Sequence, residues 1–364
     1  MERRAFLKSA GVSTALMLTG LPKLARAAQD GAAAGWRTFE VATRVEPANP
    51  AGISRAWVPL PLATDTDYFR RVGESTWKGN AAVTRAYRDE KYDAPFLYVE
   101  WPQSEKAPAV QIVSRFATRD RFVDLTRPPA MVAKDSPAEL KKYLEPTKLI
   151  PTDGLVLETS REITQGARTD MDKARAIYEW IVDNTFRDPK VRGCGLGDIK
   201  TMLETRNFGG KCADLNALFV GLARAGGIPA RDIYGIRVAD SKEFKSLGKS
   251  GDISKAQHCR AEFYESTFGW VPVDPADVRK VVLEEAPGLT INDAAPRRAR
   301  AKLFGQWEMN YLCYNRAHDV KLPNASGAPV AFLMYPQGET DEGRKDSLEP
   351  TTFKYQITSR EITG

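Results

Sequence analysis

The sequence predicts an α+β protein in which an antiparallel β-sandwich-like domain precedes a domain of helices packed on an antiparallel sheet. Short segments rich in β-branched and aromatic residues, separated by Pro, Gly and Asn turns, fill residues 36–127. Helical patterns dominate residues 136–225, and strand patterns return after Pro229. Because helices and later strands are grouped along the chain, the order is typical of an α+β arrangement.

The N-terminal residues resemble an export signal. Arg3 and Arg4 precede a modestly apolar run at 12–21, and the small residues at 25–27 are typical of a cleavage point. We therefore expect residues 1–27 to be a twin-arginine signal peptide that directs the folded protein to the bacterial periplasm. No later segment is long and apolar enough to span a bilayer, so the mature chain should lack a membrane span.

Charge argues against nucleic acid as a partner. The 364 residues carry a net charge of +6 and give a pI near 9.0. Residues 1–27 hold five basic residues and one acidic residue, which leaves about +2 for the rest of the chain. No Lys/Arg run interleaved with aromatic residues occurs, so the remainder lacks the basic footprint of a nucleic-acid-binding protein.

Four segments are expected along the chain. The first domain shows no catalytic constellation, which favours a packing or substrate-positioning role for it. The expected segments are the signal peptide (1–27), an N-terminal β-domain (35–130), a catalytic domain (131–320) and C-terminal strands that pack on the core (321–364).

Several helices are expected in the second domain. Ser136 and Asp198 stand at positions typical of N-caps, and residues 169–186 carry apolar residues at helical spacing. A further helix should run from Cys212 to about residue 225, with one apolar stripe. That stripe consists of Leu215, Leu218, Phe219, Leu222 and Ala223.

Cys212 opens this helix, where a thiol has chemical consequences. Free N–H groups and the positive end of the helix dipole stabilise a thiolate and lower its pKa, and Lys211 adds positive charge. Gly209 and Gly210 leave room for a substrate, and the N–H of Cys212 is a candidate oxyanion donor. A buried structural cysteine is the alternative, but position 212 lies off the apolar stripe.

His258 and Asp274 are predicted to meet on a hairpin. The segment from 257 to 275 has strand character with a turn near 265–269. Alternation places His258 and Asp274 on one face, directly opposite or one diagonal step apart, where a carboxylate can orient an imidazole. The chain has only two histidines, so this placement is informative.

The remaining candidates carry less information. No CxxC or HxxxH pair exists, so no zinc site is expected. The four cysteines allow three full pairings, and a Cys194–Cys212 disulfide is one option. Cys259 should point away from His258, and His318 is expected to be structural. Residues 240–257 form either a mobile flap beside the site or a plain surface loop.

The segments around Cys212, His258 and Asp274 resemble the core of the transglutaminase-like superfamily over about residues 170–280, including a bacterial branch often described as cysteine proteases. The resemblance implies a papain-like α+β fold and a Cys212–His258–Asp274 triad. The family's second oxyanion donor has no clear match, and Trp180, Asn207 and Gln257 are candidates.

We therefore expect an exported thiol enzyme that acts on an amide of a protein or peptide, through an acyl-enzyme and without cofactor or metal. Hydrolysis is favoured, since water competes unless an amine pocket is built. Two alternatives stay open: amine transfer to glutamine with the same triad, and a peptide-binding module without chemistry.

Overall fold

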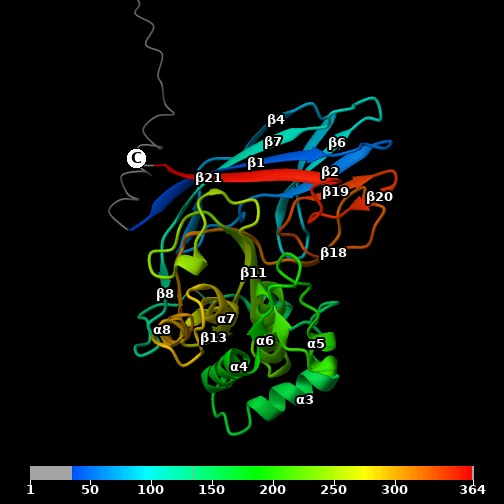
Figure 1. Ribbon diagram of the computed structural model, residues 1–364. Coiled ribbons are helices and arrows are strands. Elements are labelled where there is room, and N and C mark those ends of the chain that lie inside the picture. The colour runs from blue at the N-terminus through cyan, green and yellow to red at the C-terminus, as the bar shows by residue number, and fades with distance from the viewer. Residues whose placement is uncertain (1–34, 133, 363–364) are drawn as a thin grey trace, which may run out of the picture.

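The computed structural model describes residues 35–132 and 134–362. It confirms the α+β class: strands form one part of the molecule, and helices gather around a second, smaller sheet (Figure 1). The expected signal peptide, residues 1–27, lies outside the described residues. Within the described ranges, no helix has the length and apolar character needed to cross a membrane.

The N-terminal domain is built from strands whose side chains alternate between buried and more exposed positions, as in β1 and β7. This alternation is typical of a sheet with one face in a core. The strands are β1 (Arg37–Pro47), β2 (Ser54–Pro59), β3 (Phe69–Arg71), β4 (Thr76–Gly79), β5 (Val83–Arg88), β6 (Pro95–Trp101), β7 (Val110–Thr118) and β8 (Arg121–Phe122).

Two antiparallel sheets share a core in this domain, which confirms the expected sandwich-like arrangement. One sheet has the order β12-β21-β1-β7-β3, with β4 also paired to β7, and the other has the order β20-β19-β2-β6-β5. Val45 of one sheet and Val58 and Val99 of the other belong to the same buried apolar cluster. Burying such side chains stabilises the pair of sheets.

The C-terminal strands differ from the expected placement. We expected residues 321–364 to pack on the catalytic core, and Met334 and Tyr335 do belong to the buried apolar cluster around α6. In contrast, β19 (Gln337–Thr340), β20 (Gly343–Lys345) and β21 (Phe353–Ile362) complete the two N-terminal sheets. Figure 1 shows β21 beside β1, from the opposite end of the chain, and the two pair along most of their length. This pairing depends on backbone hydrogen bonds, which composition does not reveal.

The helices of the second domain begin where capping residues predict. Ser136 accepts a hydrogen bond from the Glu139 N–H at 3.2 Å, and Asp198 accepts one from the Thr201 N–H at 3.1 Å. The helices are α2 (Pro137–Lys142), α3 (Gly154–Ile163), α4 (Asp170–Asn184), α5 (Ile199–Thr205), α6 (Cys212–Ala225), α7 (Pro275–Glu284) and α8 (Ala294–Lys302).

The central helix α6 is buried on every side. It packs on the antiparallel sheet β14-β13-β11-β16, and α3, α4, α5 and α7 also contact it. Every residue from Cys212 to Arg224 is buried, so the helix buries the expected apolar stripe and its other faces as well. The polar side chains of α6 are buried because neighbouring segments hydrogen-bond them.

The remaining strands are short or belong to the second domain. They are β9 (Phe186–Arg187), β10 (Gly209–Gly210), β11 (Ala230–Arg237), β12 (Gly251–Asp252), β13 (Gln257–Glu265), β14 (Gly269–Val273), β15 (Gln306–Trp307), β16 (Tyr311–Asn315), β17 (His318–Val320) and β18 (Val330–Phe332). A single 3₁₀ turn, η1 (Lys245–Leu247), precedes β12.

Candidate active site

Cys212 is the first residue of α6 and lines a cleft of about 800 Å³. Its side chain is 5% exposed, and its N–H has no acceptor among the described residues. Asp214 folds back to accept the Lys211 N–H at 2.9 Å, which fixes the first turn of the helix. The N-terminus of α6 thus presents a thiol and a free N–H to the cleft.

His258 and Asp274 lie together at the end of the β13–β14 hairpin. Ala261 pairs with Val273, so the two residues are one diagonal step apart, which is one of the two predicted registers. His258 Nε2 and Asp274 Oδ2 are 2.7 Å apart, and both side chains are buried. Asp274 is also the N-cap of α7, where it accepts the Asp277 N–H at 3.1 Å.

Three side chains that the sequence analysis did not identify hold this pair. Asn216, one helical turn after Cys212, donates to Asp274 Oδ1 at 3.1 Å and to the Cys259 carbonyl at 2.8 Å. Asp277 Oδ2 lies 3.3 Å from His258 Nε2, and Arg237 donates to both Asp277 oxygens. The spacing of Asn216 after Cys212 and of Asp277 after Asp274 was the available signal.

The charges around His258 favour its protonated form. Burial and Arg237 lower the pKa of His258, but Asp277 and Asp274 outweigh them and raise it to about 9. Arg237 and His258 hold the pKa of Asp277 well below its ordinary value despite its burial. Burial and the charge of Asp277 raise the pKa of Asp274. His258 is therefore an imidazolium at neutral pH.

Cys212 belongs to a cluster of three buried thiols. The sulfur atoms of Cys194, Cys212 and Cys259 all lie within 4.8 Å of one another. Hydrogen bonds from Cys194, Cys259 and His258 hold the pKa of Cys212 well below 9.0 despite its burial. The pKa values of Cys194 and Cys259 are raised well above 9.0. The cluster thus concentrates one negative charge on Cys212.

The position of Cys194 explains this contact. Its glycine-rich loop is bound to the start of α6, since its carbonyl accepts the Ala213 N–H at 2.9 Å and its sulfur lies 3.2 Å from the Gln257 carbonyl oxygen. Cys259 points away from His258 as predicted, into the core that α6 shares. None of the four cysteines forms a disulfide in the structure.

Among the residues that the structure describes, two groups of side chains have donor atoms close enough to share a metal ion. One is the thiol cluster, whose three sulfurs would suit a soft ion. The other is His258, Asp274 and Asp277. In that group Arg237 already neutralises Asp277, with its Nη2 2.6 Å from Asp277 Oδ1. The fixed guanidinium makes the second group a poor site for a cation.

Only one of the three side chains considered as a second oxyanion donor lines the cleft. Gln257 lies beside His258 there, is 9% exposed and has an Nε2 without a hydrogen-bond partner among the described residues. Trp180 instead packs on Phe208, with ring centroids 5.5 Å apart. Asn207 is exposed and accepts the Gly209 N–H at 3.2 Å.

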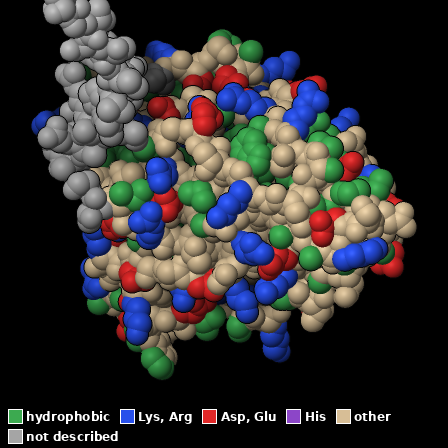
Figure 2. Space-filling model, turned by 90° about the horizontal axis from the view of Figure 1, so that it is seen from above, with side chains coloured by type: hydrophobic (Ala, Val, Ile, Leu, Met, Phe, Trp, Pro, Cys, Tyr) green, Lys and Arg blue, Asp and Glu red, His purple; other side chains and the backbone are tan. Residues whose placement is uncertain are grey.

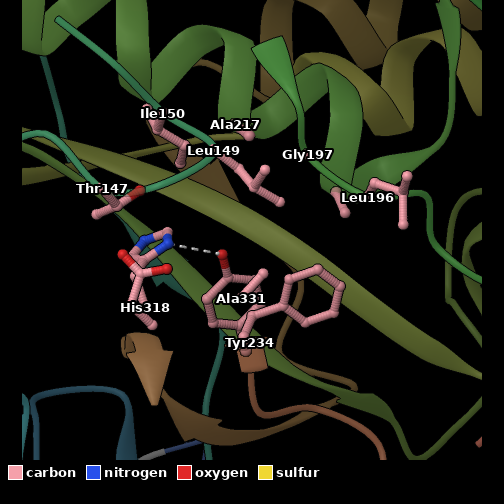
Figure 3. Close-up of a pocket in the computed structure, with 12 residues that line it drawn as sticks. Thr147, Leu149, Ile150, Leu196, Gly197, Ala217, Tyr234, His318 and Ala331 are labelled. Atoms are coloured by element: carbon pink, nitrogen blue, oxygen red, sulfur yellow. Dashed lines mark hydrogen bonds between the residues drawn. The ribbon is translucent and has the colours of Figure 1, made fainter. Parts of the chain in front are cut away.

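His318 lies in a separate, small pocket. Figure 3 shows His318 and Tyr234 facing one another, and their Nδ1 and hydroxyl oxygen are 3.4 Å apart. Nε2 lies 3.3 Å from Asp232 Oδ2. The pocket has a volume of about 10 Å³, room for one water molecule. His318 is therefore a buried histidine of the core, consistent with the structural role expected for it.

The comparisons with known proteins agree with this fold. The sequence model of the Transglutaminase-like superfamily matches residues 158–275. The chain is 34% identical over 335 residues to an uncharacterized protein of Haemophilus influenzae, which covers 87% of this chain and 89% of that protein. The chain belongs to the transglutaminase-like superfamily.

Two solved structures resemble this chain to different degrees. One, described as a "Putative Cysteine Protease" from Cytophaga hutchinsonii, has a TM-score of 0.50 and 15% identity, and covers 89% of this chain and 98% of its own. The periplasmic domain of TgpA from Pseudomonas aeruginosa has a TM-score of 0.34 and 15% identity, and covers 68% of this chain and 90% of its own. At 15% identity, the similarity to the Cytophaga hutchinsonii structure is evidence for the fold alone.

Proposed function

We propose that the protein is an exported thiol enzyme that cleaves amides through a Cys212–His258–Asp274 triad. The observation that carries the proposal is the buried 2.7 Å contact between Asp274 and His258, at a cleft that Cys212 also lines. The lowered pKa of Cys212 and the raised pKa of His258 favour a thiolate–imidazolium pair at neutral pH. Export rests on the signal-like residues 1–27.

The proposed reaction has two steps. The Cys212 thiolate attacks the amide carbonyl, and His258 donates its Nδ1 proton to the departing nitrogen as the C–N bond breaks. Water then attacks the thioester, His258 accepts a proton from that water, and the Cys212 thiolate leaves. Asp274 holds Nε2 throughout, so the ring keeps its orientation and Nδ1 remains available for transfer.

Two donors are available for the developing oxyanion. The Cys212 N–H is free at the start of α6, and the unpartnered Gln257 Nε2 lines the same cleft. Donors of this kind stabilise the tetrahedral intermediate more than the substrate carbonyl. We assign Gln257 the role of second donor on this basis.

Water is the proposed acyl acceptor. A primary amine is protonated at neutral pH, and the cleft lining contains seven Lys and Arg side chains against one carboxylate, Asp252. This charge opposes entry of a cationic amine. Incorporation of a labelled primary amine into protein glutamine at a rate comparable to hydrolysis would instead assign amine transfer.

The test is the alkylation rate of Cys212 by iodoacetamide from pH 5 to 9, read by peptide mass spectrometry. We expect rapid labelling already near pH 6, because the thiolate forms well below 9.0. In His258→Ala the ion pair is lost, so labelling at pH 6 should fall by about tenfold or more.

Cys212→Ser is the control that sets the background from the other three thiols. The proposal fails if labelling of the wild-type protein rises only near the ordinary thiol pKa, about 8.5, and does not depend on His258. That outcome would favour a peptide-binding module.

A further inference from the structure

The cleft at Cys212 carries a local excess of positive charge. Of the eight charged Lys, Arg and Asp side chains in its lining, only Asp252 is acidic. The chain outside residues 1–27 has a net charge of only about +2. Figure 2 looks down on the strand-rich end of the molecule, where side chains of both signs are interspersed. The excess is therefore a property of the cleft.

Four of the basic side chains already have carboxylate partners, so their charge is largely balanced. Arg237 is the buried one among them, and it belongs to the network around His258. The ion pairs are Arg187 with Glu284, Lys280 with Glu284 at 3.7 Å, Arg192 with Asp346 at 2.8 Å and Arg237 with Asp277 at 2.6 Å.

The other three are lysines without a carboxylate partner among the described residues. Lys211 directly precedes Cys212, while Lys249 and Lys255 lie on the segment between β11 and β13. Lys249 and Lys255 are exposed and Lys211 is half-buried, so all three can meet a ligand. The three ammonium groups share the cleft with one carboxylate, that of Asp252. Its Oδ1 accepts a hydrogen bond from the Ser254 hydroxyl at 2.6 Å.

The segment that carries Lys249 and Lys255 is held in place. The Lys249 N–H donates to the Ala239 carbonyl at 3.0 Å, and the Ile253 N–H donates to the Ile357 carbonyl at 2.8 Å. Ile253 is fully buried, and β12 pairs with β21. Of the two expectations for residues 240–257, the structure therefore gives a segment beside the site, with its backbone anchored to the β-domain.

Another part of the lining is apolar. Residues between 335 and 355 contribute Tyr335, Leu348, Phe353 and Tyr355 to the same cleft. Leu348 and Tyr355 are half-buried, so a ligand that fills the cleft would meet ammonium groups and apolar surface together. Cations in a concave, low-dielectric wall raise the local concentration of anionic ligands.

We propose that the amide cleaved at Cys212 belongs to an acidic peptide. Its carboxylates bind to Lys211, Lys249 and Lys255, and an apolar side chain of the peptide packs on the apolar part of the lining, at Leu348 and Tyr355. This inference rests on the proposed function of the same cleft and adds the substrate class. An acidic peptide replaces the missing counter-charges of the three lysines, whereas a basic peptide would be repelled.

The test compares two reagents that alkylate Cys212 by the same displacement of iodide: neutral iodoacetamide and anionic iodoacetate. The rate ratio of iodoacetate to iodoacetamide, divided by the same ratio for glutathione, measures the potential at the thiolate. We expect a ratio well above one at low salt. In the variant with Lys211, Lys249 and Lys255 all changed to Gln it should fall by about five- to tenfold, and about 0.5 M salt should abolish most of the difference.

A matched control removes the same net charge elsewhere. Lys78, Lys134 and Lys321 are exposed, form no ion pair among the described residues and do not line the cleft. Their triple change to Gln should leave the ratio within about twofold of wild type, because screening limits charge effects over such separations.

A second arm uses peptides as probes. Hexaglutamate should protect Cys212 from iodoacetamide at a concentration at least about tenfold lower than hexaglutamine does. The inference is supported if both arms behave as stated. It is overturned if the cleft variant keeps the wild-type ratio, or if the two peptides protect equally. Either of these negative results can be distinguished from failure of the proposed triad, because the triad is tested separately by the pH dependence of labelling with iodoacetamide.

Discussion

The carboxylate of Asp274 contacts both the start of helix α7 and the ring of His258. Its Oδ1 accepts the Asp277 N–H in the first turn of α7 and the amide of Asn216, while Oδ2 contacts His258 at 2.7 Å. Since the same group caps the helix and orients the imidazole, the position of the ring is tied to the fold of the hairpin and α7. Asp277, three residues on, adds a second negative charge to His258 Nε2.

We predict that Asp277→Asn lowers the pKa of His258 from about 9 by about one unit or more. The sign follows from the removed charge, because Asp277 stabilises the imidazolium. The thiolate–imidazolium pair requires a protonated His258. In the variant the pair should therefore be lost at a lower pH than in the wild-type protein. The measurement is an NMR titration of the His258 ring.

The His258 signal is easy to assign in this titration, because the chain contains only two histidines. Asp232→Asn is the matched control: Asp232 is fully buried and lies 3.3 Å from the other histidine, His318, so its change should leave the titration of His258 unchanged. An unaltered titration of His258 in Asp277→Asn would exclude the second carboxylate as a determinant of its charge.

At the scale of elements, the start of α6 is fixed by the loop that carries Cys194. Asp214 accepts the N–H groups of Leu196 and Gly197, each at 2.9 Å, in addition to that of Lys211. One buried carboxylate thus joins the loop to the first turn of the helix. The thiol cluster exists because this joint brings Cys194 against Cys212.

Gly195→Ala should disrupt the hydrogen bonds between the Cys194 loop and Asp214. Gly195 has a φ of +91°, and a Cβ there would lie 1.8 Å from Asp214 Oδ2. We expect a loss of about 2–4 kcal/mol in the free energy of unfolding, from backbone strain plus the displaced carboxylate. Urea denaturation measures the loss, and the iodoacetamide profile should show a higher pKa for Cys212.

Gly227→Ala provides the comparison. Gly227 has a similar φ of +83°, but nothing lies within 4 Å of the added Cβ. Only the strain term applies, so about 1 kcal/mol should be lost and the pKa of Cys212 should not change. Equal losses in the two variants would mean that the contact with Asp214 contributes nothing.

At the scale of the whole molecule, a buried ionic network joins the two domains. Glu262 of β13 is fully buried and accepts hydrogen bonds from Arg121 of β8 and, at 2.5 Å, from Arg231 of β11. Arg316 lies 3.8 Å away. Three guanidinium groups thus surround one carboxylate, and Arg231 also lies 3.8 Å from Asp135. Glu262 connects the segment leaving the N-terminal domain to the central sheet.

Glu262→Gln should therefore destabilise the protein by about 3–5 kcal/mol near neutral pH, because buried charges lose their partner. Despite burial, the arginines lower the pKa of Glu262 from 4.5 to about 2. A depressed pKa stabilises the fold above pH 4.5, and this contribution is lost as the pH falls towards 2. The stability difference between wild type and variant should shrink over that range in urea denaturation.

Glu40→Gln is the surface control. Glu40 pairs with Arg115 and Arg360, whose side chains are 50% and 67% exposed. Exposed pairs contribute little, so the loss should be about 1 kcal/mol or less. A similar loss in both variants would argue against the buried network as the main link between the domains.

The sequence by itself determined the elements and the chemistry-bearing residues. Turn residues, capping residues and alternation are local signals, so the strands of 36–127, the caps Ser136 and Asp198, and the turn near 265–269 could be predicted. The choice of Cys212, His258 and Asp274 followed from residue type, scarcity and strand alternation, and the resemblance to a known superfamily linked the three.

Only the tertiary structure decided what surrounds these residues. The pairing of β21 with β1, the burial of every face of α6 and the contact of Cys194 with Cys212 join segments far apart in the chain. Such contacts depend on how whole elements pack, and no local periodicity encodes them. The positive cleft likewise arises because folding gathers lysines from separate segments of a nearly neutral chain and leaves their counter-charges elsewhere.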